Sequence, residues 1–272
     1  MAKKERIDVL LVERGLIETR EKAKRSVMAG LVLCNNERVD KPGTKVDLDA
    51  KLLVKGDLLP YVSRGGLKLE KAIQEFQFDL NNKVVLDIGS STGGFTDCAL
   101  QNGAALVYAV DVGYNQLAWK LRQDERVVVM ERTNFRYVTA ADFTKGFPNF
   151  ATIDVSFISL RLILPALANV LEKGSHVSAL VKPQFEAGRD EVGKKGIVKD
   201  ERVHQKVLQE IVDFALKIGF DVYGLSYSPI KGGEGNIEFL LHLYWSGTAN
   251  IGESRIPAIS DLVASAHNNL KL

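Results

Sequence analysis

From residue 83 onward, short apolar runs alternate with segments of helical spacing, and no other feature of the sequence constrains the fold as strongly. The apolar runs predict five strands, at residues 84–88, 106–110, 127–130, 150–153 and 176–181. Helices are predicted at about residues 95–102, 158–171 and 203–218. Strands and helices that alternate in this way form a doubly wound α/β sheet, with parallel strands and helices on both faces.

Two later strands, 222–227 and 237–244, are joined by a glycine-rich loop that leaves no room for a crossover helix. They must therefore pair antiparallel. A terminal antiparallel hairpin on a doubly wound sheet is typical of the Rossmann-like class I methyltransferase fold and less typical of dinucleotide-dependent dehydrogenases. Residues 247–272 carry weaker structural signals and are interpreted as a C-terminal tail that is partly helical.

The first 60 residues have a different pattern. Helical spacing at residues 5–14 and 19–29 is followed by short alternating apolar pieces that are separated by turns. Two helices and a small β unit make a compact α+β module. A connector with a glycine pair follows at 60–66, and helical spacing resumes at 67–76. The predicted organisation is a small domain, a catalytic domain and the tail, at residues 1–60, 61–246 and 247–272.

The composition argues against metal and membrane proteins. The 272 residues carry a net charge of +2 and only two cysteines, which form no metal-binding pair, and the four histidines are scattered. The chain does not start with an apolar signal core, and it has no run of about 18 apolar residues. We therefore expect a cytoplasmic protein without a metal site or membrane association. Trp119 and Trp245 are expected to be packing residues, and platforms for base stacking are the alternative.

A glycine-rich turn at residues 84–96 is the strongest local signal for a ligand. A buried strand runs into Asp87 and Gly89, and a helix opens immediately afterwards at Gly93. Glycines in such a turn let the backbone approach a ligand closely. Asp111 follows the next strand, where a carboxylate can accept hydrogen bonds from ribose hydroxyls. The GxGxxG spacing of a dinucleotide site is absent, and two carboxylates suit a cationic ligand better than a pyrophosphate. A glycine-rich turn without a ligand is the alternative.

Three charged residues at distant sequence positions converge by topology. Asp154 and Lys182 each follow directly after a predicted parallel strand. Glu238 lies near the start of the last strand, and because that strand is reversed, its beginning lies at the same edge of the sheet. Ligands of open α/β sheets bind at this carboxyl edge. Each residue alone would be interpreted as a surface charge, whereas their convergence favours a functional site.

Residues 61–245 resemble the FtsJ-like ribose 2′-O-methyltransferases, and the whole chain resembles the TlyA family, whose members carry the names haemolysin A and ribosomal RNA methyltransferase. The resemblance lies in RGGLKL from Arg64, DIGSSTGGFT from Asp87, DVSFIS from Asp154, VKPQF from Val181 and GGEGNIE from Gly232. It implies S-adenosylmethionine as cofactor and a catalytic tetrad of Lys68, Asp154, Lys182 and Glu238. Lys68 enters only through the resemblance, and so does Asn134 as a partner of the adenine ring. The predicted cofactor-binding residues are Asp87, Gly89, Ser90, Ser91, Gly93, Gly94, Phe95, Asp111 and Asn134.

The tetrad suits the chemistry of a ribose hydroxyl, which is a poor nucleophile until it loses its proton. Lys182 could act as the general base if its neutral form is accessible. A cation such as Lys68 nearby would favour that form, and the two carboxylates would oppose it while orienting the ammonium group. In the alternative role, Lys182 stabilises the developing alkoxide electrostatically.

Residues 6–54 resemble the S4 RNA-binding domain, through RIDVL from Arg6, Thr19-Arg20 and the Gly30-Leu-Val32 stretch. The dipeptide at 19–20 departs from the usual Ser-Arg, which threonine tolerates because it can also cap a helix. The resemblance implies contacts to phosphates of a folded RNA. The candidate RNA-binding residues are Arg6, Arg20, Lys22, Lys24, Arg25 and, in the connector, Arg64. A solvated helix face is the alternative for each of them.

These features together predict an S-adenosylmethionine-dependent methyltransferase that modifies a ribose 2′-hydroxyl of ribosomal RNA, with ribosomal RNA or a ribosomal subunit as partner. Two other hypotheses are a membrane-acting haemolysin and an S4-anchored RNA-binding or assembly factor without activity. A haemolysin that acts on membranes would need a signal peptide or a spanning segment, and the sequence shows neither. The intact tetrad argues against the second. The loop 184–199 beside Lys182 could be a lid, an RNA-contacting loop or an ordinary exposed loop.

Overall fold

The computed structural model describes residues 4–28, 30–55, 59–232, 235–248 and 250–270. The chain divides into two compact units, Met1–Pro60 and Tyr61–Leu272. The residues of each unit form apolar clusters of their own.

The N-terminal unit combines two helices with short strands, as its sequence predicts. Its elements are β1 (Lys4–Arg6), α1 (Ile7–Glu13), α2 (Arg20–Met28), β2 (Val32–Cys34), β3 (Glu37–Val39), β4 (Lys45–Asp47) and β5 (Leu52–Val54). Strands β1 and β4 pair, and β2 lies between β3 and β5, all antiparallel. The helices bury Ile7, Leu11 and Val27 against Val32, because these side chains recur on one face of each helix. The predicted helix end at residue 29 lies outside the described residues.

The second unit is built on a seven-stranded sheet in the order β11-β12-β10-β9-β6-β7-β8. Its strands are β6 (Val84–Ile88), β7 (Leu106–Val110), β8 (Val127–Met130), β9 (Phe150–Ile153), β10 (Ser175–Val181), β11 (Phe220–Tyr227) and β12 (Phe239–Trp245). Strand β12 is antiparallel to both β10 and β11, and the pairs from β8 to β10 are parallel. The predicted doubly wound sheet and its antiparallel C-terminal pair are both confirmed.

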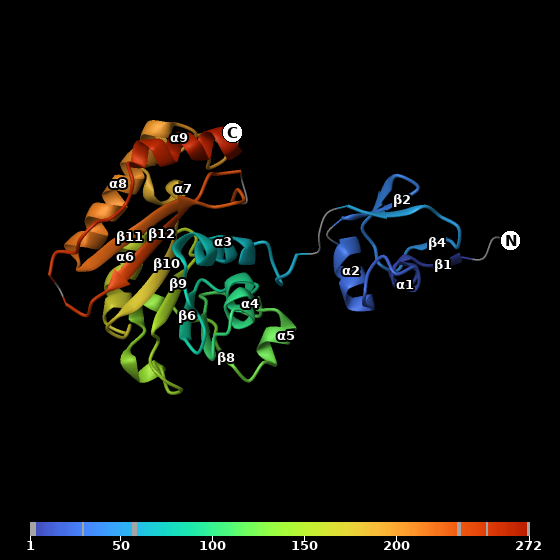
Figure 1. Cartoon of the computed structure of the whole chain (residues 1–272), viewed down its shortest axis with the longest axis horizontal. Coiled ribbons are helices and arrows are strands. Elements are labelled where there is room, and N and C mark those ends of the chain that lie inside the picture. The colour runs from blue at the N-terminus through green and yellow to red at the C-terminus, as the bar shows by residue number, and fades with distance from the viewer. Residues whose placement is uncertain (1–3, 29, 56–58, 233–234, 249, 271–272) are drawn as a thin grey trace. The chain divides into compact units, whose positions relative to one another are not determined.

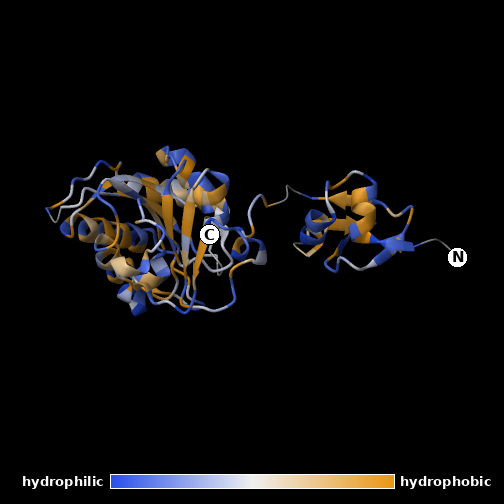
Figure 2. Ribbon diagram, turned by 90° about the horizontal axis from the view of Figure 1, so that it is seen from below, coloured by the Kyte–Doolittle hydropathy of each residue, from blue (hydrophilic) through white to orange (hydrophobic). Residues whose placement is uncertain are grey.

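Helices cover both faces of this sheet (Figure 1). They are α3 (Gly66–Phe76), α4 (Gly94–Gln101), α5 (Trp119–Arg122), α6 (Leu160–Ala168), α7 (Pro183–Glu186), α8 (Glu201–Lys217) and α9 (Ile259–Leu270), with three 3-10 turns at Phe135–Tyr137, Ala140–Asp142 and Arg189–Glu191. Buried side chains of α3, α4 and α5 form one apolar core with the sheet, and those of α6, α8 and α9 form the other. Apolar residues accordingly concentrate on the strands between the two layers (Figure 2).

Two features of the second unit differ from what the sequence suggests. Trp119 was expected to be a packing residue, but 71% of its surface is exposed, because α5 has a single turn and buries only Leu121. Trp245 is buried as predicted. Residues 247–272, interpreted as a tail, include α9, whose Val263 and Ala266 are buried against the core that α8 also lines.

No helix among the described residues is long and apolar enough to cross a membrane.

Candidate active site

Four charged residues from four different elements meet at the carboxyl edge of the sheet. Asp154 follows β9, Lys182 follows β10, and Glu238 precedes the reversed strand β12. Lys68 comes from the first turns of α3, which packs against β12. The topology therefore brings Asp154, Lys182 and Glu238 together as the strand directions predict, and it adds the lysine that the resemblance implied.

The four side chains form a continuous chain of ion pairs. Lys68 Nζ lies 2.7 Å from Glu238 Oε2 and 3.4 Å from Asp154 Oδ2. Lys182 Nζ lies 2.6 Å from Asp154 Oδ1 and donates to Ser156 Oγ at 3.1 Å. Asp154 thus bridges the two lysines, and the tetrad carries two positive and two negative charges.

Burial makes these pairs stronger than ordinary surface ion pairs. Lys68, Lys182 and Glu238 are buried, with Glu238 only 2% exposed. Burial alone would lower the pKa of Lys68, but the nearby Asp154 and Glu238 carboxylates outweigh it and raise that pKa above its usual value. Lys68 therefore stays charged across the physiological range.

The tetrad opens into a cavity of about 680 Å³. The glycine-rich turn forms one wall through Gly89, Ser90, Ser91, Gly94 and Phe95, and the other walls include Arg64, Lys195 and Asn236. A second cavity of about 300 Å³ has mostly apolar walls, among them Ile88, Val110 and Ile163. Both cavities are lined by Gly89, Ser91, Asp154, Ser156 and Phe157, so they adjoin at the glycine-rich turn and at the segment that begins with Asp154.

Asp111 and Asn134 line the second cavity, as a cofactor site would require. Asp111 Oδ2 accepts a hydrogen bond from the Ser91 backbone N–H, and its Oδ1 accepts from the Gly113 N–H, both at 2.7 Å. Each carboxylate oxygen can accept a further bond through its remaining lone pair. Asn134 Oδ1 accepts from the backbone N–H of Arg136 at 3.2 Å, which leaves its amide N–H groups as candidate donors.

Asp87 and Gly93 do not line either cavity. The Asp87 carboxylate is fully buried and accepts hydrogen bonds from Thr96 Oγ1 at 2.6 Å and Thr152 Oγ1 at 2.9 Å. Burial raises its pKa to about 6, although the two threonine hydroxyls oppose the shift. Gly93 has a φ of +96°, and a Cβ there would lie 2.3 Å from a methyl of Leu121. Both residues therefore support the glycine-rich turn without lining either cavity.

Two residues of the site are not predicted as site residues from the sequence. Ser156 holds the Lys182 ammonium group, and Phe157 lies beside it with 90% of its surface exposed and a φ of +62°. The Phe157 ring packs at 5.0 Å from the ring of Phe185. Their position two and three residues after Asp154, at the end of a predicted strand, was the signal that could have identified them.

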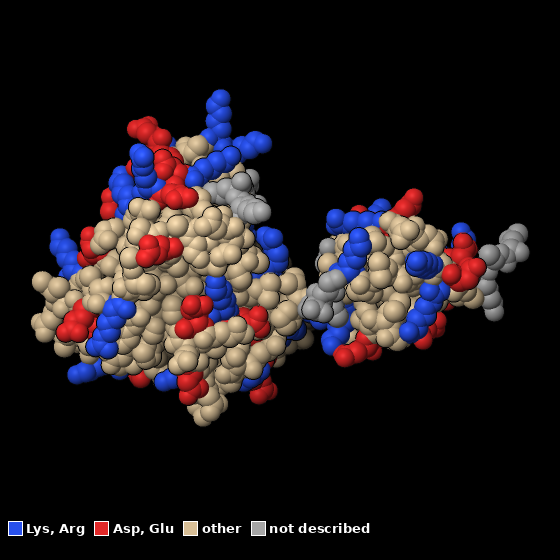
Figure 3. Space-filling model, turned by 45° about the horizontal axis from the view of Figure 1, so that its top comes forward, with Lys and Arg blue, Asp and Glu red and all other residues tan. Residues whose placement is uncertain are grey.

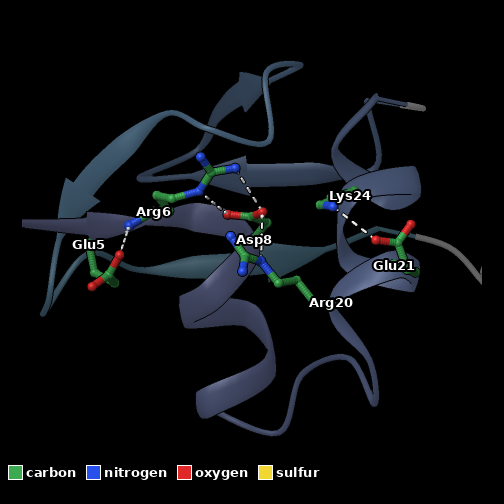
Figure 4. A network of polar contacts seen from close by, with 6 residues as sticks. All are labelled: Glu5, Arg6, Asp8, Arg20, Glu21 and Lys24. Carbon is green, nitrogen blue, oxygen red and sulfur yellow. Dashed lines mark hydrogen bonds and ion pairs between the residues drawn. The ribbon is translucent and has the colours of Figure 1, made fainter.

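The candidate RNA-binding residues of the N-terminal unit form separate groups. Arg6 and Arg20 both bind the buried carboxylate of Asp8, with Nε–Oδ distances of 2.9 and 3.3 Å (Figure 4). The hydrogen bond from Arg6 lowers the pKa of Asp8 against the effect of burial. Lys24 pairs with Glu21 at 2.8 Å, and Lys22 pairs with Glu18.

Arg25 is exposed on α2, and Arg64 belongs to the other unit, where it lines the larger cavity. On the face of the N-terminal unit drawn in Figure 3, basic and acidic side chains are interspersed. The basic side chains therefore lie among acidic ones and do not form a broad patch of one sign on that face.

A sheet of this order with one reversed strand, and adjoining cavities at its carboxyl edge, defines the class of protein: a Rossmann-like methyltransferase with an additional N-terminal unit. The family model of FtsJ-like methyltransferases matches residues 61–245, and that of the S4 domain matches residues 5–52. The chain belongs to the FtsJ-like methyltransferases and, within them, to the TlyA family, which also carries the name haemolysin A.

Several relatives match over nearly their whole length. A Bacillus subtilis protein named provisionally as an rRNA methyltransferase is 67% identical over 272 residues, which cover 99% of this chain and 96% of the relative. The Mycobacterium tuberculosis protein named 16S/23S rRNA (cytidine-2'-O)-methyltransferase TlyA is 41% identical over 244 residues. The matched region covers 89% of this chain and 91% of the relative. A solved structure from Streptococcus thermophilus, described provisionally as a hemolysin, is 58% identical in sequence and superposes with a TM-score of 0.79. The match covers 100% of this chain and 98% of the solved chain.

Proposed function

We propose that this methyltransferase uses S-adenosylmethionine to methylate a ribose 2′-hydroxyl of ribosomal RNA. The observation that carries the proposal is the tetrad of buried Lys68, Lys182 and Glu238 with partly buried Asp154, which lines the larger cavity and meets the smaller one at Asp154. The relatives named as rRNA (cytidine-2'-O)-methyltransferases support the choice of RNA and of the ribose hydroxyl. A ribosomal substrate would place the protein in the cytoplasm.

The chemistry of the two cavities fits the cofactor. The apolar walls of the smaller cavity suit an adenine ring, and the Asp111 carboxylate and Asn134 amide supply polar groups for ribose and base. A Cβ at Gly89 would lie 2.6 Å from the backbone oxygen of Asp154, so the turn and the catalytic loop approach as closely as backbones can. Residues 89–95 would hold the methionine part. When bound, S-adenosylmethionine supplies a methyl group on a positively charged sulfur.

The two lysines have different roles in this proposal. Lys68 contacts two carboxylates and stays charged, so it fixes Asp154 and Glu238 and cannot accept a proton. Lys182 contacts one carboxylate and the Ser156 hydroxyl, and its Nζ lies on the wall of the larger cavity. We assign it to the proton of the ribose hydroxyl: once Nζ has released its own extra proton, the lone pair of the neutral amine accepts the hydroxyl proton as the oxygen attacks the methyl group. The fixed distance to Asp154 orients Nζ for this transfer.

The N-terminal unit would position the RNA. Asp8 holds the guanidinium groups of Arg6 and Arg20 on the same small surface, and two arginines around one carboxylate leave a net positive charge for phosphates. Lys22, Lys24 and Arg25 of α2 and Arg64 beside the larger cavity would add contacts that depend on salt concentration.

The test incubates the protein with labelled S-adenosylmethionine and separate ribosomal subunits, followed by digestion to nucleosides. We expect label in 2′-O-methyl nucleosides. Lys182→Ala should abolish transfer while RNA affinity is retained, and the exposed Lys199→Ala serves as the matched control. Lys182→Arg separates the two roles of the lysine, because arginine keeps the charge but cannot act as a base. Activity retained by Lys182→Ala would overturn the mechanism, and a wild-type protein without transfer to either subunit would indicate an RNA-binding factor.

A further inference from the structure

The segment 193–198 forms part of the wall of the larger cavity, and it is held there by a buried side chain. Asn236 is 1% exposed. Its Oδ1 accepts a hydrogen bond from the Val198 N–H at 2.9 Å, and its Nδ2 donates to the Gly196 carbonyl at 2.8 Å. The segment also closes on itself, because the Gly193 N–H donates to the Ile197 carbonyl at 3.0 Å. The loop is therefore anchored to the segment just before β12, which also carries Glu238.

The anchored segment presents Lys195 to the cavity. Lys195 and Gly196 line the larger cavity, whereas the neighbouring Lys194 lines a separate surface depression. Lys195 has a φ of +71°, a conformation that costs a residue with a Cβ about 1 kcal/mol relative to the usual one. Such a conformation persists only where the surrounding structure imposes it. Here the hydrogen bonds of Asn236 to Gly196 and Val198 supply that constraint.

The charges around the cavity favour an anion at Lys195. Lys68 and Lys182 are paired with Asp154 and Glu238, so the tetrad is neutral overall. The other charged side chains that line the cavity among the described residues are all basic: Arg64, Lys195 and Lys231. Arg64 and Lys195 therefore add positive charge to the rim of a cavity whose tetrad is neutral overall.

The sheet order indicates which ligand meets Lys195. Asp111 follows β7 and Gly89 follows β6, so the proposed cofactor lies on that side of the sheet. Lys195 is tied to the segment before β12, beyond β9 and β10 on the opposite side. A nucleotide that brings its ribose to Lys182 would enter on this side.

We propose that the cavity wall formed by Lys195 and Gly196, which Asn236 anchors, is a phosphate-binding wall in which Lys195 contacts the RNA backbone next to the target ribose. The inference rests on the proposed function and names a contact within it. Lys195 binds a phosphate as a point charge, so it contributes affinity and position without reading the base. Asn236 acts through Lys195 and is a positioning residue.

The test compares Lys195→Gln with the matched control Lys194→Gln in methylation of the ribosomal substrate. We expect Lys195→Gln to raise KM for RNA about threefold or more at low salt, with little change in kcat or in KM for S-adenosylmethionine. Losing one phosphate contact should reduce the slope of log KM against log salt by about 0.7 to 1, so the difference from wild type shrinks by a factor of about 2.6 to 4 between about 50 and 200 mM salt. Lys194→Gln should leave all of these values near those of wild type.

Each outcome decides a different claim. If wild type methylates RNA and the two glutamine variants behave alike, the phosphate wall is overturned and the proposed function stands. A rise in KM for S-adenosylmethionine alone would assign Lys195 to the cofactor carboxylate and would also overturn it. In an Asn236→Ala background, Lys195→Gln should have no further effect on KM for RNA, because the anchor no longer holds the lysine. Fully additive effects would refute the positioning role of Asn236. A wild-type protein without transfer would refute the proposed function instead.

Discussion

Replacing Asp87 by asparagine should stabilise the second unit at neutral pH. Asp87 is completely buried, and its folded-state pKa is about 6 against a usual value of 3.8. The folded protein therefore favours the protonated acid. The stability that the protonated Asp87 side chain contributes is fully present below about pH 4 and is lost as the pH rises through about 6. A difference of about two pH units corresponds to ~3 kcal/mol, which the buried charge costs the protein above pH 6.

The asparagine side chain would imitate the protonated acid at every pH. Its amide oxygen can accept from one of the hydroxyls of Thr96 and Thr152, and the other hydroxyl must turn to accept from the amide N–H, at a cost of about 1 kcal/mol. We therefore expect Asp87→Asn to gain about 2 kcal/mol near pH 7.5. Between about pH 7.5 and 4.5 its advantage over wild type should fall by about 2 kcal/mol, because wild-type Asp87 takes up its proton over that range.

Tryptophan fluorescence during denaturant unfolding suits this measurement. Both tryptophans, Trp119 and Trp245, belong to the second unit, so the signal reports the unfolding of that unit. Asp213→Asn, at an exposed carboxylate of α8, is the control and should change the free energy of unfolding by less than about 0.5 kcal/mol at both pH values. An Asp87→Asn advantage that is independent of pH, or a loss of stability near pH 7.5, would refute the account of Asp87 as a buried charge that costs stability.

Two further substitutions test the site. Lys68→Met should cost about 3–5 kcal/mol at neutral pH because it leaves the buried Glu238 without its cation, and adding Glu238→Gln should restore part of the loss in the same unfolding assay. Unchanged stability in the single variant would contradict the pairing. Gly89→Ala should weaken S-adenosylmethionine binding in calorimetry at least about tenfold, since its Cβ would lie 2.6 Å from the Asp154 carbonyl oxygen. Gly188→Ala, whose Cβ meets only a flexible side chain at 3.4 Å, should bind like wild type, and equal affinities in both variants would argue against a close turn.

The sequence was sufficient to place the residues that end strands. Apolar runs and helical spacing predicted every strand of the large sheet within a few residues, and strand direction then placed Asp154 and Lys182 at one edge. Glu238 could be placed only because the loop before it is too short for a crossover helix. These inferences depend on backbone topology, which periodicity reports directly.

Contacts between distant elements could not be predicted in the same way. Lys68 lies on a helix that precedes the sheet in the sequence, and nothing in its local pattern shows that α3 packs against β12. Trp119 was interpreted as a packing residue, but the one-turn helix that carries it has too little buried surface to cover it. In both cases the outcome is decided by which surfaces meet in the fold, and this information is absent from spacing along the chain.

The two aspartates of the cofactor region show why residue type alone does not define a role. Asp87 lies near the end of one parallel strand and Asp111 follows the next, and the sequence predicts that both bind the cofactor. Asp87 is the second-last residue of β6 and lies inside the sheet, where Thr96 and Thr152 use both of its oxygens. Asp111 lies one residue beyond β7, on a cavity wall, and binds only backbone N–H groups. A shift of two positions relative to the strand end changes a carboxylate from a buried support of the turn into a candidate ligand contact.

The direction of β12 has a similar consequence for the tetrad. In a fully parallel sheet, the residue before this strand would lie at the amino edge, far from Asp154 and Lys182. Because β12 is reversed, Glu238 and Asn236 lie in one short segment at the carboxyl edge. Glu238 holds Lys68, and Asn236 holds the segment with Lys195. One reversed strand thus supplies both the carboxylate that completes the neutral tetrad and the anchor of its basic rim, so a change in the position of β12 should disturb catalysis and RNA affinity together.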